Sequence, residues 1–313
     1  MKPSLVFGAT VDDAEPFEAR WMRSAAALHA LGGIGEGTVV ALMLHNEPIM
    51  LELMLALRWI GARAFPVSTQ LEAAELTQVL LDSEAALMIV HADLVDRGAG
   101  PAWPNGLRVL AATPSPWTCS QLGLDDAPTA QGLGLPEWAD WRDGPPHPMP
   151  PQRAARPAHV DALIAAGRTR FGCEAGMRTL VSTPLYDSGA NGYLLAAALH
   201  DALIVIEPRF DAEATLRLVA QHRLTHLCLA PTMFVRLLRL PPELSACHDL
   251  SSIRFVACAG APCPGEIRRR MIEWWGPVIH ERDAAGEFGP ITHSDGAQAL
   301  RTSGPSPAEE RPG

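Results

Sequence analysis

The sequence predicts an α/β protein with two βαβ-type subdomains and mainly parallel sheets. Two observations indicate this class. Short apolar runs alternate with longer segments of helical periodicity between residues 39 and 90, and the same alternation returns between residues 178 and 280. Strands that alternate with helices form parallel sheets through right-handed crossovers, and such sheets bind ligands at the loops along one edge.

The first subdomain opens with a predicted helix over Phe17 to Leu31, which Gly32 and Gly33 close. The elements predicted after it are strands at 39–44, 64–67 and 86–90 and helices at 48–60 and 72–83. The glycine cluster at 32–37 precedes a strand, whereas a dinucleotide-binding loop follows one, so we interpret it as a helix end and turn. We find no convincing chemical constellation in this half.

The second subdomain repeats the pattern. Its predicted strands are at 178–183, 203–207, 225–229, 252–258 and 277–280, and its predicted helices are at 193–200, 212–222, after Pro231, and at 266–275. Asp211 is a predicted helix cap, with Glu213 in the first turn. His222 and His226 have a spacing that suits zinc on one helix, but a strand begins between them, so we do not expect a shared metal.

Proline and glycine become frequent between the two subdomains, which predicts a partly extended connection. We therefore divide the chain into an α/β subdomain at 1–97, a connection at 98–158, a second α/β subdomain at 159–290 and a polar tail at 291–313.

Composition narrows the classes of function. The formal charge of −10 argues against nucleic-acid or anionic-membrane binding, which needs a basic surface. The six cysteines form no CxxC pair, no signal peptide opens the sequence and no apolar run is long enough to span a membrane, so we expect a cytoplasmic protein. Lys2 is the only lysine, so no interior lysine exists to bind a phosphate or act as a base.

Several strings resemble one family. PRFDAEATLRLVAQHRLTHLCLAPTMFVRLLRLPPEL, DLSSIRFVACAGAPCP and MIEWWGPVIHE resemble the core of the adenylate-forming superfamily, specifically bacterial acyl-CoA synthetases. MRTLVSTPLYDSGANGY looks like its acyl-pocket motif, and the stretch from VVALMLHNEP to AALMIV looks like its N-terminal subdomain. The resemblance covers most of the chain in the family's order and implies the fold of the N-terminal domain of acyl-CoA synthetases.

The resemblance also implies site residues. The acyl-pocket motif places Tyr186, Asp187, Asn191 and Gly192 at the substrate. An acid at Asp187 is unfavourable for a carboxylate substrate, and the structural alternatives are that Asp187 caps a helix and Tyr186 is merely packed.

The nucleotide site is implied in the same way. Gly260, Ala261 and Pro262 match the segment that contacts adenine. Glu287 matches the carboxylate that holds Mg²⁺ on the phosphates, which makes it the candidate catalytic and metal-binding residue. ATP or AMP and Mg²⁺ are the ligands that follow from the resemblance.

Three family features are missing. The Ser/Thr/Gly-rich phosphate loop that ends in lysine is not found after the proline-rich segment, the catalytic lysine has no counterpart, and the C-terminal domain that forms the CoA channel does not follow. Each loss should lower adenylation, which depends on positioned cations, and the last argues against CoA binding.

Three functions stay open at this point. The first is a catalytically impaired synthetase-like protein that keeps an acyl or adenylate pocket, or that acts as the partner of an intact synthetase. The second is an active acid–CoA ligase for a bulky carboxylic acid, with a C-terminal domain supplied in trans. The third is a structural dimerisation partner, which predicts a large apolar surface patch. Uncovered sheet edges favour a homodimer.

Overall fold

The computed structural model describes residues 2–95, 103–124, 126–152, 157–258, 261–282 and 293–294. The chain forms two compact units, Met1–Phe210 and Asp211–Gly313, and each is considered by itself. This division differs from the ranges 1–97, 98–158, 159–290 and 291–313, which remain a sequence-based prediction.

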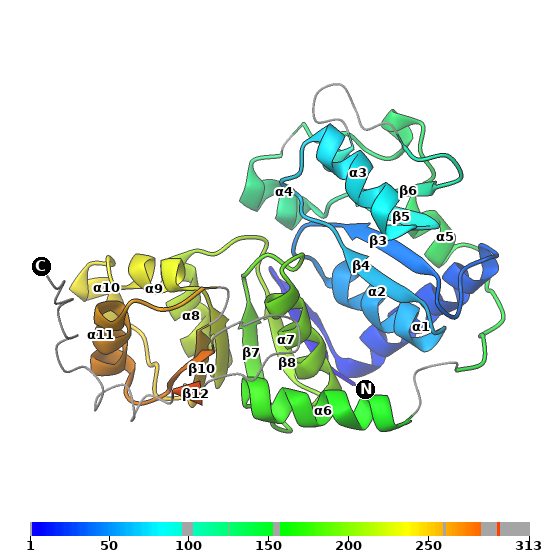
Figure 1. Ribbon diagram of the computed structural model, residues 1–313. Coiled ribbons are helices and arrows are strands. Elements are labelled where there is room, and N and C mark those ends of the chain that lie inside the picture. The colour runs from blue at the N-terminus through cyan, green and yellow to red at the C-terminus, as the bar shows by residue number, and fades with distance from the viewer. Residues whose placement is uncertain are drawn as a thin grey trace, which may run out of the picture. The chain divides into compact units, whose positions relative to one another are not determined.

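One sheet of the first unit is fully parallel and has the strand order β4-β3-β5-β6 (Figure 1). Its members are β3 (Val39–Met43), β4 (Arg63–Pro66), β5 (Leu87–His91) and β6 (Arg108–Ala112). The three strands that the apolar runs predict are confirmed to within one residue at each end. β6 was missed because it lies in the proline- and glycine-rich segment.

Helices cover both faces of this sheet. Figure 1 shows α3 (Ala73–Ser83) on one side and α1 (Ala14–Ala30) and α2 (Pro48–Trp59) on the other. α3 begins with a capping box between Glu72 and Glu75. The core under α3 consists of alternate residues of the strands and one stripe of the helix, namely Ala41, Met43, Met88, Val90, Leu76 and Leu80, with Val67 and Leu94.

A second group of strands in the first unit pairs in the order β7, β8, β1 and β2. These are β7 (Arg178–Val181), β8 (Leu203–Ile206), β1 (Ser4–Phe7) and β2 (Thr10–Asp12), and only β2 is antiparallel to its neighbour. β1 and β2 were not predicted from the sequence. Ser4 pairs with Leu203, far away in sequence, so the pairing that forms β1 has no local signal.

The other elements of the first unit are η1 (Ala92–Leu94), α4 (Pro116–Leu122), η2 (Gln131–Leu133), α5 (Trp138–Asp143), α6 (Pro157–Phe171) and α7 (Ser188–Leu199). The connection predicted to be partly extended also contains the helices α4 and α5 and the strand β6. No helix of the described residues is long and apolar enough to cross a membrane.

The second unit contains α8 (Ala212–His222), β9 (His226–Leu229), α9 (Pro231–Leu237), α10 (Pro242–Ala246), β10 (Phe255–Cys258), α11 (Gly265–Trp275), β11 (Ile279–Arg282) and β12 (His293–Ser294). β9, β10 and β11 are parallel neighbours, and β12 is antiparallel to β11. Asp211 caps α8 as predicted, since its carboxylate accepts a hydrogen bond from Ala214 N. The α/β class with mainly parallel sheets is confirmed.

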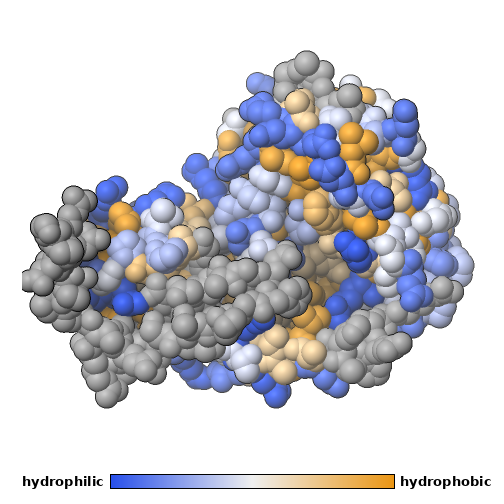
Figure 2. Space-filling model, in the orientation of Figure 1, coloured by the Kyte–Doolittle hydropathy of each residue, from blue (hydrophilic) through white to orange (hydrophobic). Residues whose placement is uncertain are grey.

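Exposed apolar side chains are spread over several elements. The large hydrophobic residues with the most exposed side chains, Val11, Leu81, Trp141 and Met149, come from β2, α3, α5 and the segment after α5. Figure 2 shows hydrophobic areas interspersed with hydrophilic ones on the visible face.

A buried carboxylate joins three helices of the first unit. Glu52 on α2 has a side chain only 1% exposed, and it pairs with Arg20 of α1 at 3.1 Å and with Arg142 of α5 at 3.3 Å. It also accepts a hydrogen bond from Ser24 of α1. A buried charge persists only when it is paired and hydrogen-bonded, so this network fixes how the three helices pack.

Asn46 joins the two sheets of the first unit. It follows β3 and is 5% exposed. Its Nδ2 donates to the carbonyl oxygens of Thr183, 2.9 Å away, and Glu207, 3.3 Å away, which follow β7 and β8. Its Oδ1 accepts from Leu185 N at 2.9 Å. One amide thus ties the end of β3 to the ends of two strands of the other sheet.

We expect Asn46→Ala to lower the free energy of unfolding by about 3 kcal/mol, because Leu185 N–H and two carbonyl groups lose a buried partner. Asn46→Asp should also destabilise, since a carboxylate oxygen would face two carbonyl oxygens. Urea unfolding monitored by circular dichroism measures both. The control is Gln78→Ala on the exposed side of α3, and equal stability of the Asn46 and Gln78 variants would contradict the prediction.

Candidate functional site

The strand order reverses direction between β3 and β5. The chain passes from β3 through α2 to β4 on one side, and then through α3 to β5 on the other side of β3. The loops after β3 and β5 therefore leave the sheet edge in opposite directions, and in open α/β sheets ligands bind at such a switch point. His45 follows β3 here, whereas His91 ends β5 and Asp93 lies just beyond it.

A pocket of about 380 Å³ lies at this edge. Its lining combines polar groups from the loops with apolar side chains from neighbouring segments: Leu44, His45, Asn46, Thr69, Gln70, Asp93, Leu122, Leu124, Pro184, Tyr186 and Pro208. The volume is in the range of pockets that hold small organic ligands.

Two polar side chains of the pocket form a pair. His45 Nε2 lies 2.8 Å from Asp93 Oδ2, and the two side chains are 10% and 6% exposed. Because an ionised carboxylate only accepts hydrogen bonds, His45 is the donor. The other carboxylate oxygen, Asp93 Oδ1, is buried and has no hydrogen-bond partner in the part of the chain that the structure describes.

His91 lies behind this pair and is fully buried. Its Nδ1 accepts a hydrogen bond from the backbone N–H of His45 at 3.0 Å, so in the neutral ring Nε2 carries the proton. Nε2 lies 3.9 Å from Glu47 Oε2. Burial lowers the pKa of His91 to about 4, although the charge of Glu47 acts against that shift. His91 is therefore uncharged at neutral pH.

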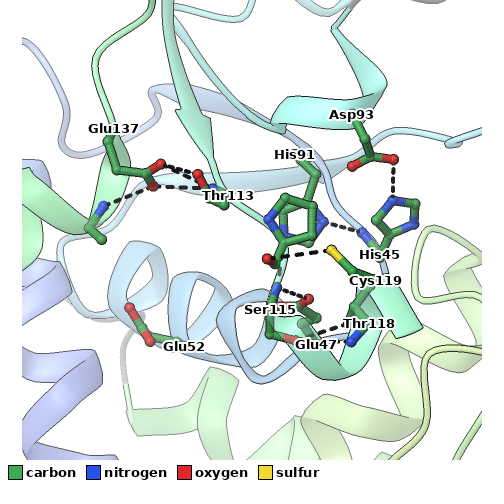
Figure 3. Close-up of polar contacts among 12 residues, drawn as sticks. His45, Glu47, Glu52, His91, Asp93, Thr113, Ser115, Thr118, Cys119 and Glu137 are labelled. Atoms are coloured by element: carbon green, nitrogen blue, oxygen red, sulfur yellow. Dashed lines mark hydrogen bonds and ion pairs between the residues drawn. The ribbon is translucent and has the colours of Figure 1, made fainter. Parts of the chain in front are cut away.

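Glu47 connects the cluster to α4. It precedes α2, and its Oε1 accepts from Ser115 N at 2.9 Å. Ser115 is the cap of α4, where its hydroxyl accepts from Thr118 N. Figure 3 shows the side chains of His45, Glu47, His91 and Asp93 gathered in one place next to the start of α4.

His45, His91 and Asp93 are close enough to suggest a metal site, since their ligand atoms lie within 4.8 Å of one another. The hydrogen bonds argue against it. The lone pair of His91 Nδ1 faces a backbone N–H and its Nε2 carries the proton, so neither nitrogen is free to bind a cation unless the bond to His45 N breaks.

The structure places the predicted substrate residues in different settings. Tyr186 lines the pocket. Asp187 caps α7 by accepting from Gly189 N and Ala190 N at 2.9 and 3.1 Å, as the structural alternative has it. Asn191 donates to Leu185 O at 3.1 Å. The Cβ of a side chain at Gly192 would meet no atom within 4 Å. Their contact with a substrate stays a prediction.

The predicted nucleotide residues are only partly described. Ala261 and Pro262 are exposed between β10 and α11. Gly260 and Glu287 lie outside the described residues, so their predicted roles toward adenine and Mg²⁺ remain predictions. His222 ends α8 and His226 starts β9, in agreement with the expectation that the two imidazoles do not share a helix.

Comparison with known families decides the relationship. The AMP-binding enzyme family matches residues 15–160 and 158–305, which is most of the chain. The chain belongs to this family. Among the curated relatives, a feruloyl-CoA synthase of Amycolatopsis sp is 28% identical and is matched over 81% of this chain and 50% of its own length.

Two further relatives are CoA ligases by name. 4-Coumarate–CoA ligase 3 of Arabidopsis thaliana is 26% identical over 93% of this chain and 54% of its own length. Indoleacetate–CoA ligase of Aromatoleum aromaticum is 26% identical over 82% of this chain and 52% of its own length. The chain thus spans about half the length of the curated relatives it matches.

Solved structures support the fold. The N-terminal domain of FACL13 from Mycobacterium tuberculosis has a TM-score of 0.74 at 19% identity and is covered over 76% of its length by 96% of this chain. The amide bond synthetase McbA from Marinactinospora thermotolerans has the same TM-score at 18% identity, over 96% of this chain and 60% of its own.

No convincing chemical constellation is predicted from the sequence of the first half, but the structure brings titratable side chains together there. His45, Glu47, His91 and Asp93 come together there, although His45 and His91 are 46 positions apart. The signal in the sequence was positional, because polar residues follow two of the predicted strands, those at 39–44 and 86–90. The grouping of these residues depends on the strand order, which the alternation of strands and helices does not give.

The buried neutral His91 predicts a pH dependence. The unfolded chain binds a proton at His91 below a pKa near 6.5, whereas the folded chain does so only below about 4. Stability should therefore fall as the pH falls from 6.5 to about 4, by about 3 kcal/mol from this group.

Urea unfolding at a series of pH values measures this slope. His91→Gln should flatten it between pH 6.5 and 4, and the exposed His29→Gln serves as the matched control. A wild-type slope that is the same in the His91 variant would refute the assignment.

Proposed function

We propose that this member of the AMP-binding enzyme family is an acyl-CoA synthetase-like protein that binds a carboxylic acid or its adenylate and is impaired in adenylation. The observation that carries the proposal is the pocket at the switch point of the first sheet, with Tyr186 of the acyl-pocket motif in its wall. A pocket at this place gives an acid a site within the first unit.

The lining supports an aromatic or similarly bulky acid. Leu122, Leu124, Pro184 and Pro208 supply apolar contact, and Tyr186 supplies a ring. The relatives named above carry ferulate, 4-coumarate and indoleacetate in their names, and all three are aromatic acids.

The proposed impairment of adenylation rests on the lack of any lysine beyond position 2. Lys2 is the only lysine in these 313 residues. Its side chain is 61% exposed and lies 3.7 Å from Glu18. Phosphoryl chemistry depends on cations and backbone N–H groups positioned around the phosphates, and no Ser/Thr/Gly-rich run ending in lysine follows the proline-rich segment to provide such a loop.

The second candidate is an active acid–CoA ligase. The relatives are about twice as long as the matched region, so an intact synthetase or a separate C-terminal domain could complete the site in trans. ATP, Mg²⁺ and CoA would then be used by the assembly. Acid-dependent release of AMP that appears only with the added partner supports this candidate. The spread of exposed apolar side chains over several elements gives no support to a purely structural partner.

Calorimetric titration separates these functions. We expect a non-hydrolysable feruloyl-adenylate mimic to bind and ATP with Mg²⁺ to bind weakly or not at all. Tyr186→Ala should weaken mimic binding by about tenfold or more, because the ring contact is lost, and Tyr186→Phe should retain most of it.

Two results would count against the proposal. Tight ATP binding would show that the phosphate site works and would favour the ligase. Absence of binding by both ligands would remove the acid site. Light scattering on the same sample tests the expected homodimer, which a mass equal to one chain would contradict.

A further inference from the structure

We infer that His45 is a general base in the pocket and that this site hydrolyses an acyl-adenylate to the free acid and AMP. The inference rests on the proposed binding of an acid or its adenylate, and it adds a reaction at that site. The reaction breaks an adenylate down, whereas the proposed impairment concerns the formation of one.

The hydrogen bonds of His45 leave one ring nitrogen available. His45 lines the pocket, and its side chain is 10% exposed. Its Nε2 donates to Asp93 Oδ2 at 2.8 Å, so in the neutral ring Nδ1 keeps its lone pair. Among the described residues Nδ1 has no hydrogen-bond partner, and the protein does not enclose it as it encloses the unpartnered Asp93 Oδ1 and His91 Nε2. The accessible nitrogen of this pocket-lining imidazole is therefore an acceptor, which can take a proton from a bound water.

Two contacts hold His45 in position (Figure 3). Its backbone N–H donates to His91 Nδ1 at 3.0 Å, and its ring is held by Asp93. An imidazole that a carboxylate orients through one nitrogen, with the other nitrogen open to a reactant, is the arrangement by which histidine acts as a general base. His45 is thus the catalytic residue, and Asp93 acts through it as a positioning residue.

The charges around His45 favour the protonated ring that forms when it accepts a proton. The carboxylate of Asp93 touches the ring, and Glu47 adds a second carboxylate to the cluster. His91 beside them is uncharged at neutral pH, because burial lowers its pKa to about 4. Among the described residues, neither lysine nor arginine lines the pocket. Two carboxylates without an opposing cation stabilise an imidazolium.

The reaction needs water as its only co-reactant. No serine or cysteine of the described residues lines the pocket, so we expect the base to act on water. The water oxygen attacks the acyl carbonyl carbon while His45 Nδ1 takes a proton from the water. The bond between that carbon and the bridging phosphate oxygen breaks, and AMP leaves with the electron pair. The ring then returns its proton to the solvent.

This step is within reach of a chain that is poor in cations. An acyl-adenylate is an activated anhydride, so its cleavage by water needs a placed base. Its formation from ATP instead needs cations positioned around the phosphates, and the single lysine of this chain stands at position 2.

Hydrolysis of feruloyl-adenylate by the full chain tests the inference, with ferulate and AMP measured by chromatography. The wild type should be about a hundredfold faster than His45→Gln, because the base is lost. The exposed His29→Gln is the matched control and should equal the wild type. In ¹⁸O-labelled water the label should enter ferulate and not AMP, since the acyl carbon is attacked.

The pH profile separates a base from a residue that only supports the fold. The wild-type rate should rise between about pH 5.5 and 7.5, as imidazole loses its proton. Asp93→Asn should lower the rate and move the rise to lower pH, because the carboxylate that stabilises the protonated ring is gone. The non-hydrolysable mimic should bind His45→Gln within about threefold of the wild type, which shows that the pocket is intact.

The outcomes separate this inference from the proposed function. Equal rates for the wild type and His45→Gln, label in AMP, or an acyl group left on the protein in mass spectra would overturn the inference. Mimic binding without hydrolysis would also overturn it and leave the proposed function standing. Absence of both would overturn both. If His45→Gln loses mimic binding, the Asp93→Asn profile decides, and an unshifted profile overturns the inference.

Discussion

The packing of the two sheets in the first unit depends on the buried side-chain amide of Asn46. Asn46 leaves β3 and hydrogen-bonds backbone groups that follow β7 and β8, so the two sheets of this unit meet at a fixed point. An amide suits this position because it is both donor and acceptor, whereas a carboxylate or an apolar side chain could satisfy only part of the surrounding backbone. The same residue lines the pocket, so the contact that joins the sheets also shapes the candidate site.

The polar cluster next to Asn46 shows how a fold can hold two carboxylates and two imidazoles with little solvent. Each member is oriented by another or by a helix cap: His45 by Asp93, His91 by the backbone of His45, and Glu47 by Ser115. Burial keeps His91 neutral, and its hydrogen bond to a backbone N–H fixes the tautomer. Together these constraints leave one carboxylate oxygen, on Asp93, unpaired among the described residues.

The likeness of this chain to its family is clearer in the fold than in the residues proposed to handle phosphate. The family match extends over nearly the whole sequence, and the structure keeps parallel sheets with loops along one edge. The proposed impairment concerns the residues that would handle phosphate, because the single lysine stands at position 2. An acid pocket needs shape and a few polar groups, whereas adenylation needs several positioned charges, so the first can survive changes that disable the second.

The sequence alone determined the α/β class, most strand and helix limits, the Asp211 cap and the absence of a helix shared by His222 and His226, because these depend on local periodicity and capping. It did not reveal β1, which forms only by pairing with β8 far along the chain, or β6, which is set in proline-rich sequence. Of the candidate site, the sequence indicated Tyr186 but not its neighbours His45 and Asp93. Only the tertiary structure decided that grouping, since it follows from the order in which strands pair across the switch point.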